Sequence, residues 1–414
     1  PTNPDVLLAA SWERFRQAHD FIGNGKGSSI WRSEDGGNTW KKAIEGFPQD
    51  EFVGRIGFDF ALSQPNTVYA LLDNQGKSDK PAPAPRQRGN QQQEENPIKI
   101  EDFKAMTLDQ ALALDDKKLE SFLRRNQFAT KYSPAELKRQ LKIGKITTTQ
   151  IANYLGGAVD ANAAMFGQPI KGAEVYRSED AGKSWKKVSE SDISQLYNTY
   201  GYYFGEVRVS TSDENEIFVL GVPLLVSRDG GKNFSRTDSI GRPHSDHQAM
   251  WINPKDSKHI LLGNDGGLYR SYGGGARWDH LNTQMPISQF YSIMVDDAKP
   301  YNIYGGMQDN GVWFGKSTNK PEDPWEPLLG GDGMVVAVDT RNNNIVYTGS
   351  QFGNYMRINK ETGERRRITP GHDIGNAPNR WNWRTPAELS YHNQDIVYMG
   401  SQYVYQSLDQ GNTW

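Results

Sequence analysis

Short runs of β-branched and aromatic residues recur along the chain, each directly after a turn of Pro, Asn or Asp. They read NPDVLLAAS near residue 3, QPNTVYALL at 64, NEIFVLGV at 215, DSKHILLGN at 256, PYNIYGGMQ at 300, NNIVYTGSQ at 343 and QDIVYMGSQ at 394. Runs of this length and composition, bounded by turn residues, predict buried β-strands. A second strand such as SSIWRS, AEVYRS, GLYRS or YVYQS follows, so each unit predicts an up-and-down antiparallel sheet.

An acidic, glycine-rich turn, here called the box turn, comes after most of these second strands. It reads SEDGGNTW at 33–40, SEDAGKSW at 178–185, SRDGGKNF at 227–234 and SLDQGNTW at 407–414, with a weakened copy, SYGGGARW, at 271–278. Glycine allows positive φ, and short polar side chains bond nearby backbone amides in tight turns. An internal repeat marks a stacked architecture rather than a catalytic loop. We therefore expect a structural role, with each aromatic ring buried against its hairpin, for Ser33, Asp35, Trp40, Ser178, Asp180, Trp185, Asp229, Phe234, Asp409 and Trp414.

Seven such units can be counted, and those near 301–325 and 343–369 lack the box turn. Without one long insertion the units repeat every forty to fifty residues or so, about the length of a four-stranded propeller blade. The sequence therefore predicts an all-β protein, a β-propeller of four-stranded antiparallel blades. A two-sheet sandwich is the alternative, but it does not explain so regular a repeat.

The insertion occupies residues 76–172 and divides the blades into 1–75 and 173–414. Its first part, GKSDKPAPAPRQRGNQQQEENP, has the composition of an exposed, disordered linker. The segments TLDQALALDDKKLESFLRRNQF, SPAELKRQLKIG and TTTQIANYLGGAVDANAAMF then show helical apolar spacing, with Thr107, Ser133 and Thr147 as N-caps. We expect a small helical cap on one face of the propeller.

Bulk composition excludes several classes of function. The 47 basic and 50 acidic residues leave a net charge of −3, which gives no overall attraction to nucleic acid or to an anionic membrane. No run approaches the roughly twenty apolar residues of a membrane-spanning helix. The absence of cysteine excludes disulfides and thiolate metal sites. We expect no cofactor and no metal.

The box turns resemble the Asp-box, or BNR, repeats of sialidases, sortilin-type receptors and xyloglucanase-type glycoside hydrolases. Larger segments are similar to bacterial secreted proteins with sortilin-like propellers, which are labelled glycosyl hydrolases by similarity: GRIGFDFALSQPNTVYAL, YGYYFGEVRVS, HSDHQAMWINPKDSKHILLGNDGGLYRS, FYSIMVDDAKPYNIYGGMQDNGVW and NRWNWRTPAELSYHNQDIVYMGSQYVYQS. The resemblance covers nearly the whole chain. It implies a propeller, an extracytoplasmic location (secreted, periplasmic or on the outer cell surface) and further blades on both sides of this segment. The catalytic loops of the xyloglucanase-type enzymes are not recognisable.

The stretch HSDH at 244–247 lies outside the repeat. His244, Asp246 and His247 are candidate ligand-binding residues, because imidazole and carboxylate groups bind metals and sugar hydroxyls. A structural zinc site normally needs four ligands, so we do not predict a metal here. The alternative is a polar loop near the channel, hydrogen-bonded to the adjacent blade.

Three aspartates follow or lie beside blade strands: Asp265 in GNDGG, Asp309 in MQDNG and Asp332 in GGDGM. Consecutive blades would present their carboxylates around one mouth. An inverting glycoside hydrolase needs two carboxyl groups about 6.5 to 9.5 Å apart, and these three are the candidate catalytic residues. The alternative is that each Asp only builds a turn.

Aromatic residues cluster in YNTYGYYF at 197–204 and NRWNW at 379–383. Tyr202, Tyr203, Trp381 and Trp383 are candidate ligand-binding residues, because exposed rings stack on sugars or anchor peptide segments. Buried rings would instead fill the spaces between blades.

The sequence thus predicts a secreted or cell-surface recognition module that binds a glycan or a protein segment. One alternative is an inverting glycoside hydrolase that uses two of the three aspartates. A second is an architectural subunit of a bacterial envelope complex, with the helical insertion docking an envelope protein.

Overall fold

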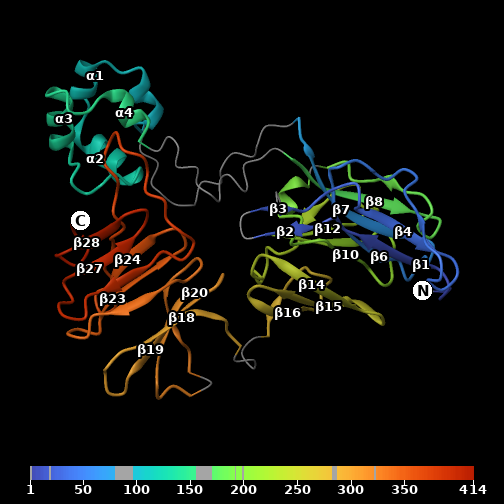
Figure 1. The fold of residues 1–414 in the computed structure, drawn as a ribbon. Coiled ribbons are helices and arrows are strands. Elements are labelled where there is room, and N and C mark those ends of the chain that lie inside the picture. Colours follow the sequence, from blue (N-terminus) through green and yellow to red (C-terminus); the bar gives the residue numbers. More distant parts are fainter. Residues whose placement is uncertain are drawn as a thin grey trace. The chain divides into compact units, whose positions relative to one another are not determined.

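The computed structural model describes residues 2–17, 20–79, 97–154, 170–191, 193–197, 200–281, 287–320 and 323–414. The chain divides into two compact units (Figure 1). Unit 1 consists of Pro1–Pro85 and Ala161–Pro286, and unit 2 consists of Arg86–Asp160 and Ile287–Trp414.

Unit 1 contains four successive antiparallel sheets and a separate hairpin. The first sheet has three strands, β1 (Leu7–Ser11), β4 (Ser29–Ser33) and β5 (Lys41–Lys42), and the hairpin of β2 (Phe15–Arg16) and β3 (Phe21–Ile22) lies between β1 and β4 in the chain. The three four-stranded sheets are β6 (Val53–Phe60), β7 (Val68–Lys77), β8 (Ile170–Ser178) and β9 (Lys186–Lys187); β10 (Glu206–Val209), β11 (Ile217–Leu220), β12 (Leu224–Ser227) and β13 (Ser235–Arg236); and β14 (His247–Asn253), β15 (Asp256–Asn264), β16 (Gly267–Ser271) and β17 (Asp279–His280).

Unit 2 continues the same pattern with three sheets. They are β18 (Phe290–Val295), β19 (Asn302–Met307), β20 (Gly311–Lys316) and β21 (Glu326–Leu329); β22 (Val336–Val338), β23 (Ile345–Ser350), β24 (Asn354–Asn359) and β25 (Arg365–Arg367); and β26 (Ala387–Leu389), β27 (Val397–Gly400) and β28 (Val404–Ser407). In all seven larger sheets the strands pair in the order in which they follow along the chain. In the first sheet the separate β2–β3 hairpin is inserted between β1 and β4.

Successive sheets within each unit pack face to face through apolar side chains. Leu71 and Val175 of one sheet meet Val219 and Leu225 of the next, and further interlayer clusters join the neighbouring pairs. The first strands of the four-stranded sheets are neighbours, β6 with β10 and β10 with β14 in unit 1, and β18 with β22 in unit 2. This is the arrangement of propeller blades. The predicted fold class, four-stranded antiparallel β-propeller blades with a small helical insertion, is confirmed, and the two-sheet sandwich is not what forms.

Antiparallel pairing places the connections between strands at two opposite ends of every sheet. We use the word edge for these two ends and not for the outermost strands. The links between first and second strands and between third and fourth strands leave at one edge, which we call the turn edge. The links between second and third strands, and those to the next sheet, leave at the opposite edge, which we call the loop edge. In the four-stranded sheets that carry a box, it joins the third strand to the fourth. The first sheet lacks an equivalent of the first strand: its register shows that β1, β4 and β5 match the second, third and fourth strands. The last box follows β28, the third strand of its sheet, so all box turns lie at the turn edge and the β2–β3 hairpin lies at the loop edge.

The box turns share one register and one hydrogen-bond pattern. In the four full copies the box serine pairs with the first residue of the preceding strand, as Ser178 does with Val68 and Ser227 with Ile217. In the copy at 178–185, the Ser178 hydroxyl donates to Asp180 Oδ1 (2.7 Å) and accepts from the N–H of Gly182 (2.8 Å), whose φ is +82°. The Ser184 hydroxyl donates to Asp180 Oδ2 (2.6 Å). The same bonds recur at Ser33, Ser227 and Ser407.

The aromatic residue that ends each box turn packs toward the preceding sheet. Trp185 is only 5% exposed and donates its indole N–H to Ala43 O (3.0 Å), whereas Phe234 and Trp414 are half-buried. The expectation of burial is wrong for Trp40, which is 38% exposed and bonds only to Gly37 O of its own turn (2.9 Å). The physical reason is that Trp40 belongs to the first sheet, and no described sheet lies before it.

The helical insertion has its own core and N-caps. It contains η1 (Ile100–Lys104), α1 (Leu108–Leu112), α2 (Asp116–Arg125), α3 (Pro134–Lys142) and α4 (Thr148–Ala152). Thr107, Ser133 and Thr147 cap α1, α3 and α4 as predicted. Asp115 caps α2, and this cap was not predicted from the sequence. Of the predicted linker at 76–97, Gly76 and Lys77 belong to β7 and residues 80–96 lie outside the described residues. The last predicted helical segment, 147–166, lies outside them from residue 155 onward.

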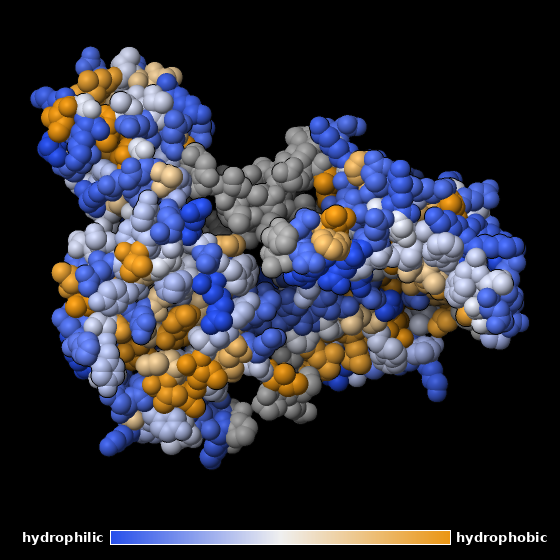
Figure 2. All heavy atoms as spheres, in the orientation of Figure 1, coloured by the Kyte–Doolittle hydropathy of each residue, from blue (hydrophilic) through white to orange (hydrophobic). Residues whose placement is uncertain are grey.

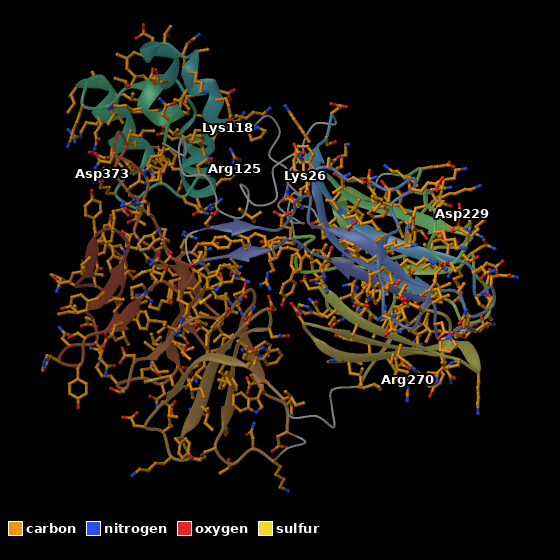
Figure 3. All side chains as sticks on the ribbon, turned by 45° about the vertical axis from the view of Figure 1, so that its right-hand side comes forward. Lys26, Lys118, Arg125, Asp229, Arg270 and Asp373 are labelled. Carbon is orange, nitrogen blue, oxygen red and sulfur yellow. The ribbon has the colours of Figure 1, made fainter. Side chains whose placement is uncertain are left out.

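The helices pack against the segment at 370–376, between β25 and β26 of unit 2. Ile374 belongs to the helical core with Phe128 and Tyr154. The Tyr154 ring stacks on His372 (4.0 Å between ring centroids), and its hydroxyl donates to His372 O (3.1 Å). Lys131 forms an ion pair with Asp373, a residue that is labelled in Figure 3. The insertion leaves and re-enters the sheets between β7 and β8, where Lys77 pairs with Ile170, and therefore starts and ends at the loop edge.

Candidate ligand-binding surface

The predicted site residues all lie at the loop edge, opposite the box turns. In unit 1 they occupy the β9–β10 loop (Tyr202, Tyr203), the β13–β14 loop with the start of β14 (His244, Asp246, His247) and the β15–β16 turn (Asp265); in unit 2 they occupy the β19–β20 turn (Asp309), the β21–β22 loop (Asp332) and the β25–β26 loop (Trp381, Trp383). The strand topology causes this separation, because box turns and these loops leave opposite ends of the same strands.

His247 is a core residue. It is fully buried, and its Nε2 lies 3.6 Å from Asp238 Oδ2. Burial alone would raise the pKa of Asp238, but the adjacent His247 side chain and hydrogen bonds from Arg236 and the Leu224 N–H outweigh it and hold that pKa below its ordinary value. No ligand from solvent reaches His247, so this residue does not fit the predicted binding role.

The remainder of the HSDH loop is tied to its own sheet. The His244 N–H donates to the Tyr269 hydroxyl (3.2 Å), and His244 O accepts from Asn264 Nδ2 (2.8 Å). Asp246 adopts a φ of +64° and accepts from the Ser245 hydroxyl (2.6 Å). Within the described ranges, no group of three or more His, Asp and Glu side chains could hold a metal ion.

Asp309 and Asp332 meet at the loop edge of unit 2. The Asp309 N–H donates to Asp332 Oδ1 (3.0 Å), and the Asp332 N–H donates to Gln351 Oε1 (3.1 Å). Asp332 is buried, and Asp309 takes a φ of +58° in its turn. Asp332 therefore supports the turn that carries Asp309, which is one of the roles expected of turn aspartates. Asp265 belongs to unit 1.

An aromatic and a cationic group lie beside this pair. Trp383 donates its indole N–H to the Tyr291 hydroxyl (3.3 Å), and Arg384 donates to Tyr291 O (3.3 Å). Burial raises the pKa of Tyr291, and the charges of Asp332 and Asp309 add to the rise while the bond from Trp383 opposes it. We call Asp309, Asp332, Tyr291, Trp383 and Arg384 the acidic cluster. Trp381 stands apart, half-buried against Gly353 and Tyr405.

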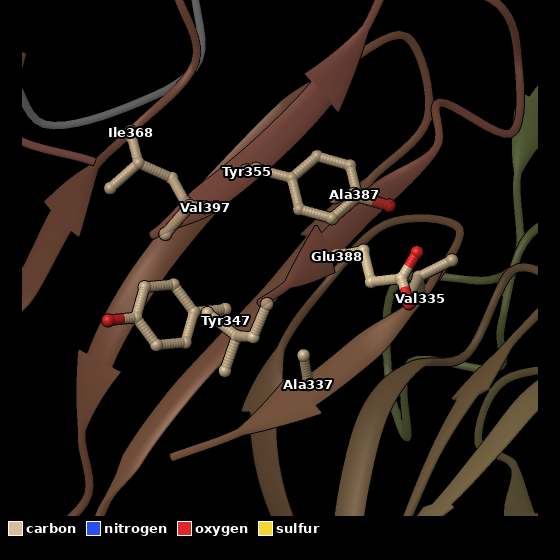
Figure 4. Close-up of a pocket in the computed structure, with 9 residues that line it drawn as sticks. Val335, Ala337, Tyr347, Tyr355, Ile368, Ala387, Glu388 and Val397 are labelled. Atoms are coloured by element: carbon tan, nitrogen blue, oxygen red, sulfur yellow. The ribbon is translucent and has the colours of Figure 1, made fainter. Parts of the chain in front are cut away.

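A small cavity lies between the last two sheets of unit 2 (Figure 4). Its lining is mostly apolar, with Tyr347, Tyr355 and Val397 around it and Glu388 as the charged residue. Its volume is about 10 Å³, roughly what one water molecule needs. The cavity is a packing gap between blades and has no room for a sugar or a side chain.

A group of exposed rings lies at the loop edge of unit 1. Phe15, Phe21 and Ile22 of the β2–β3 hairpin and Tyr203 of the β9–β10 loop are between 38% and 51% exposed. Phe21 contacts the half-buried ring of Tyr202 (4.6 Å between centroids), and Tyr202 contacts Tyr203 (6.4 Å). We call this group, with Trp12, the hairpin patch.

Three arginines border the hairpin patch. The guanidinium groups of Arg14 and Arg55 lie 5.2 and 5.9 Å from the centre of the Trp12 ring, within the range of cation–π contacts. Arg55 also donates to Tyr203 O (2.8 Å) and so fixes the loop to the sheet. The positive charge of Arg16 lowers the pKa of Tyr202 against the larger, raising effect of burial. The patch thus combines exposed rings with positive charge.

Tyr202 and Tyr203 were predicted from the sequence, whereas the hairpin and its arginines were not. The signal was present in SWERFRQAHDFIGNGKG, where a link between two blade strands carries three large aromatic residues and an isoleucine. A link of that kind is normally polar, so its apolar content indicated an extra element.

Comparison with known proteins gives no family. No family model matches the chain, and no curated protein matches it. The described residues contain no helix with the length and apolar character that crossing a bilayer requires.

Solved structures give only remote likenesses. The chain is similar to YCF48 bound to D1 peptide, with 10% identity over 99% of this chain and 94% of that chain and a TM-score of 0.31. It is also similar to the GH74 xyloglucanase from Xanthomonas campestris, with 11% identity over 98% of this chain and 54% of that chain and a TM-score of 0.33. YCF48 from Cyanidioschyzon merolae gives 17% identity over 58% and 77% of the chains, with a TM-score of 0.21. Likenesses of this size say nothing about what this chain binds.

Proposed function

We propose that the protein is a recognition module built of propeller blades, which binds a glycan or a protein segment at the loop edge of unit 1. The observation that carries the proposal is the hairpin patch. Its rings of Phe21, Tyr202 and Tyr203 are in contact one after the other, and Phe15 is exposed on the other face of the hairpin. Arginines border these rings. Contiguous exposed apolar surface is uncommon on soluble proteins and marks binding sites, and Tyr and Arg are the residues that most often dominate binding energy.

An extracytoplasmic location belongs to the same proposal. It is supported by the resemblance of the box turns to the Asp-box repeats of sortilin-like proteins. Such a module would meet glycans or protein segments outside the cytoplasm.

The test is a glycan array and a peptide array, probed with the intact 414-residue chain and with Phe21→Ala and Tyr203→Ala variants. We expect a ligand whose affinity falls in both variants while their melting temperatures stay within a few degrees of the parent. Tyr391→Ala is the matched control, because Tyr391 is an almost fully exposed ring on the last sheet. Equal loss of binding in the control would show that the patch is not the site.

The acidic cluster supports a second candidate, an inverting glycoside hydrolase. The specific observation is that Asp309 and Asp332, from neighbouring loops, lie together with Trp383 beside them. Hydrolysis of a panel of polysaccharides, assayed with Asp309→Asn and Asp332→Asn, separates the candidates. Cleavage that is lost in one of these variants at an unchanged melting temperature would favour the enzyme. A third role, docking of an envelope protein on the helical insertion, stays a prediction.

A further inference from the structure

We propose that the hairpin patch binds an extended, acidic segment of polypeptide, which adds as a third strand to the β2–β3 hairpin. This inference rests on the proposed recognition function and names its ligand. It follows from three features of the patch: an incomplete sheet, apolar side chains on both faces of that sheet, and arginines that form no ion pair with the described residues.

The hairpin is an incomplete sheet. Among the described residues, β2 and β3 pair only with each other, through Phe15 with Ile22 and Arg16 with Phe21, whereas every other sheet has three or four strands. An isolated two-stranded ribbon is marginally stable in water, and its outer edges present backbone groups that an extended peptide can bond. A bound strand would supply the missing hydrogen bonds and stiffen the hairpin.

The side chains on the hairpin suit a peptide better than a sugar. Cross-strand pairing places Phe15 and Ile22 on one face and Arg16 and Phe21 on the other. The second face rests on Tyr202. The hairpin rings of Phe15 and Phe21 offer no hydrogen bond, whereas a sugar site needs several precisely placed polar groups around its aromatic residues. Alternate side chains of an added strand would instead contact these rings directly.

The charge on the hairpin favours an acidic partner. Residues 14–22 carry Arg14 and Arg16 against one acid, Asp20, and Arg55 lies against Trp12 at its base. Neither Arg14 nor Arg16 has an ion pair within the described part of the chain. The carboxylate of the neighbouring Glu13 accepts the N–H of Gly27 (2.7 Å) and forms no ion pair with either arginine among the described residues. Guanidinium groups bind carboxylates in a two-bond geometry, so Asp or Glu side chains of the added strand are the matching partners.

Selection from a library of random short peptides displayed on phage, with the intact chain as bait, tests the proposal. We expect enriched sequences in which Asp or Glu alternates with apolar residues. A synthetic peptide of the enriched sequence should lose about tenfold or more in affinity for an Arg14→Glu/Arg16→Glu variant, as hot-spot changes do. Arg277→Glu, at an exposed site on the turn edge, should bind as the parent does.

Backbone N-methylation of the peptide at alternate residues tests strand addition without changing the protein. This test therefore remains valid even if the double variant fails to fold. We expect methylation in one register to abolish binding and methylation in the other to leave it intact. Enrichment of neutral or basic peptides, or equal binding by both methylated peptides, would overturn the inference.

A glycan array run in parallel separates this inference from the function on which it rests. A glycan whose binding is lost in Phe21→Ala and Tyr203→Ala, with no peptide enriched, would keep the recognition function and overturn the peptide ligand. Binding of neither a glycan nor a peptide would overturn both.

Discussion

Gly201 lies directly against the carboxyl group of Asp73, so closely that a Cβ on Gly201 would come within 2.0 Å of Asp73 Cγ. Asp73 is a buried residue of β7, where Oδ1 accepts from Gln75 Nε2 (2.6 Å) and Oδ2 has no hydrogen-bond partner among the described residues. Gly201 begins the turn that carries Tyr202 and Tyr203. A buried carboxyl group therefore lies beneath the loop that forms the hairpin patch.

Asp73 should make stability fall as the pH rises. Burial raises the pKa of Asp73 to about 7, while the unfolded chain titrates near 3.9. Between these values the folded chain holds a proton that the unfolded chain has lost, so the free energy of unfolding decreases as the pH rises from about 4 to about 7. Asp73→Asn is neutral throughout, and its melting temperature relative to the parent should increase between pH 5 and pH 8. A constant difference across this range would show that Asp73 does not titrate there.

Gly201→Ala should destabilise the protein by about 1 to 3 kcal/mol, as overpacking does, because the added methyl group meets a buried carboxyl that cannot move away. Gly263→Ala is the control, since a Cβ there meets nothing closer than 3.9 Å. Urea unfolding of both variants gives the comparison. If Gly201→Ala is as stable as the control, the loop lies farther from β7 than described.

Two box tryptophans should respond differently to truncation. Trp185→Ala should cost about 3 to 5 kcal/mol, as large aromatic truncations in cores do, because the ring lies in the interface between two sheets. Trp40→Ala should cost about 1 kcal/mol or less, as most partly exposed positions do. Denaturant unfolding measures both, and equal costs would contradict the exposure difference that separates them.

Acid should weaken the box turns. Burial would raise the pKa of Asp180, but bonds from Ser184 and Ser178 lower it to about 2. A carboxylate with a depressed pKa stabilises the fold above about pH 4, and this contribution is lost as the pH falls toward 2. The difference in melting temperature between the parent and Asp180→Asn should therefore be full at pH 6 and shrink below pH 4. Asp297→Asn, at an exposed loop position, serves as the control, and a difference independent of pH would count against the mechanism.

The blades should fold without the helical insertion. Residues 80–168 can be replaced by a short Gly/Ser linker, because β7 and β8 already pair as far as Lys77 and Ile170. We expect a cooperative thermal transition to persist, at a lower temperature, since His372 and Ile374 lose their contacts with the helices. Loss of any cooperative transition would make the insertion part of the blade core. Circular dichroism at increasing temperature gives the result.

A structural feature could be predicted from the sequence when the residues that produce it lie close together in the chain. The box turn is decided within eight residues, by Ser178, Asp180, the glycine and the residue that bonds the carboxylate, and the helix caps at Thr107 and Thr147 are decided within four. The box turns and the helix caps could therefore be predicted from the sequence alone. The exposure of Trp40 depends on which sheet lies beside it, and no local pattern contains that information.

The candidate site was less predictable for the same reason. His247 looked like a ligand in HSDH, but its environment comes from Asp238 in the preceding loop. Asp73 was not predicted as a special residue, because Gly201, which lies against its carboxyl group, is far away in the chain. The hairpin patch needs the contact between Phe21 and Tyr202, two residues that only folding brings together.

The separation of box turns from loops has a consequence for engineering. The hydrogen-bonded turns that close the sheets all lie at one edge, and the segments at the other edge can change in length without touching them. The link between β7 and β8 accommodates a complete helical subdomain, while the equivalent link between β15 and β16 is a two-residue turn at Asp265 and Gly266. Exchange of these segments, one blade at a time, is therefore a direct route to new binding specificities on an unchanged scaffold.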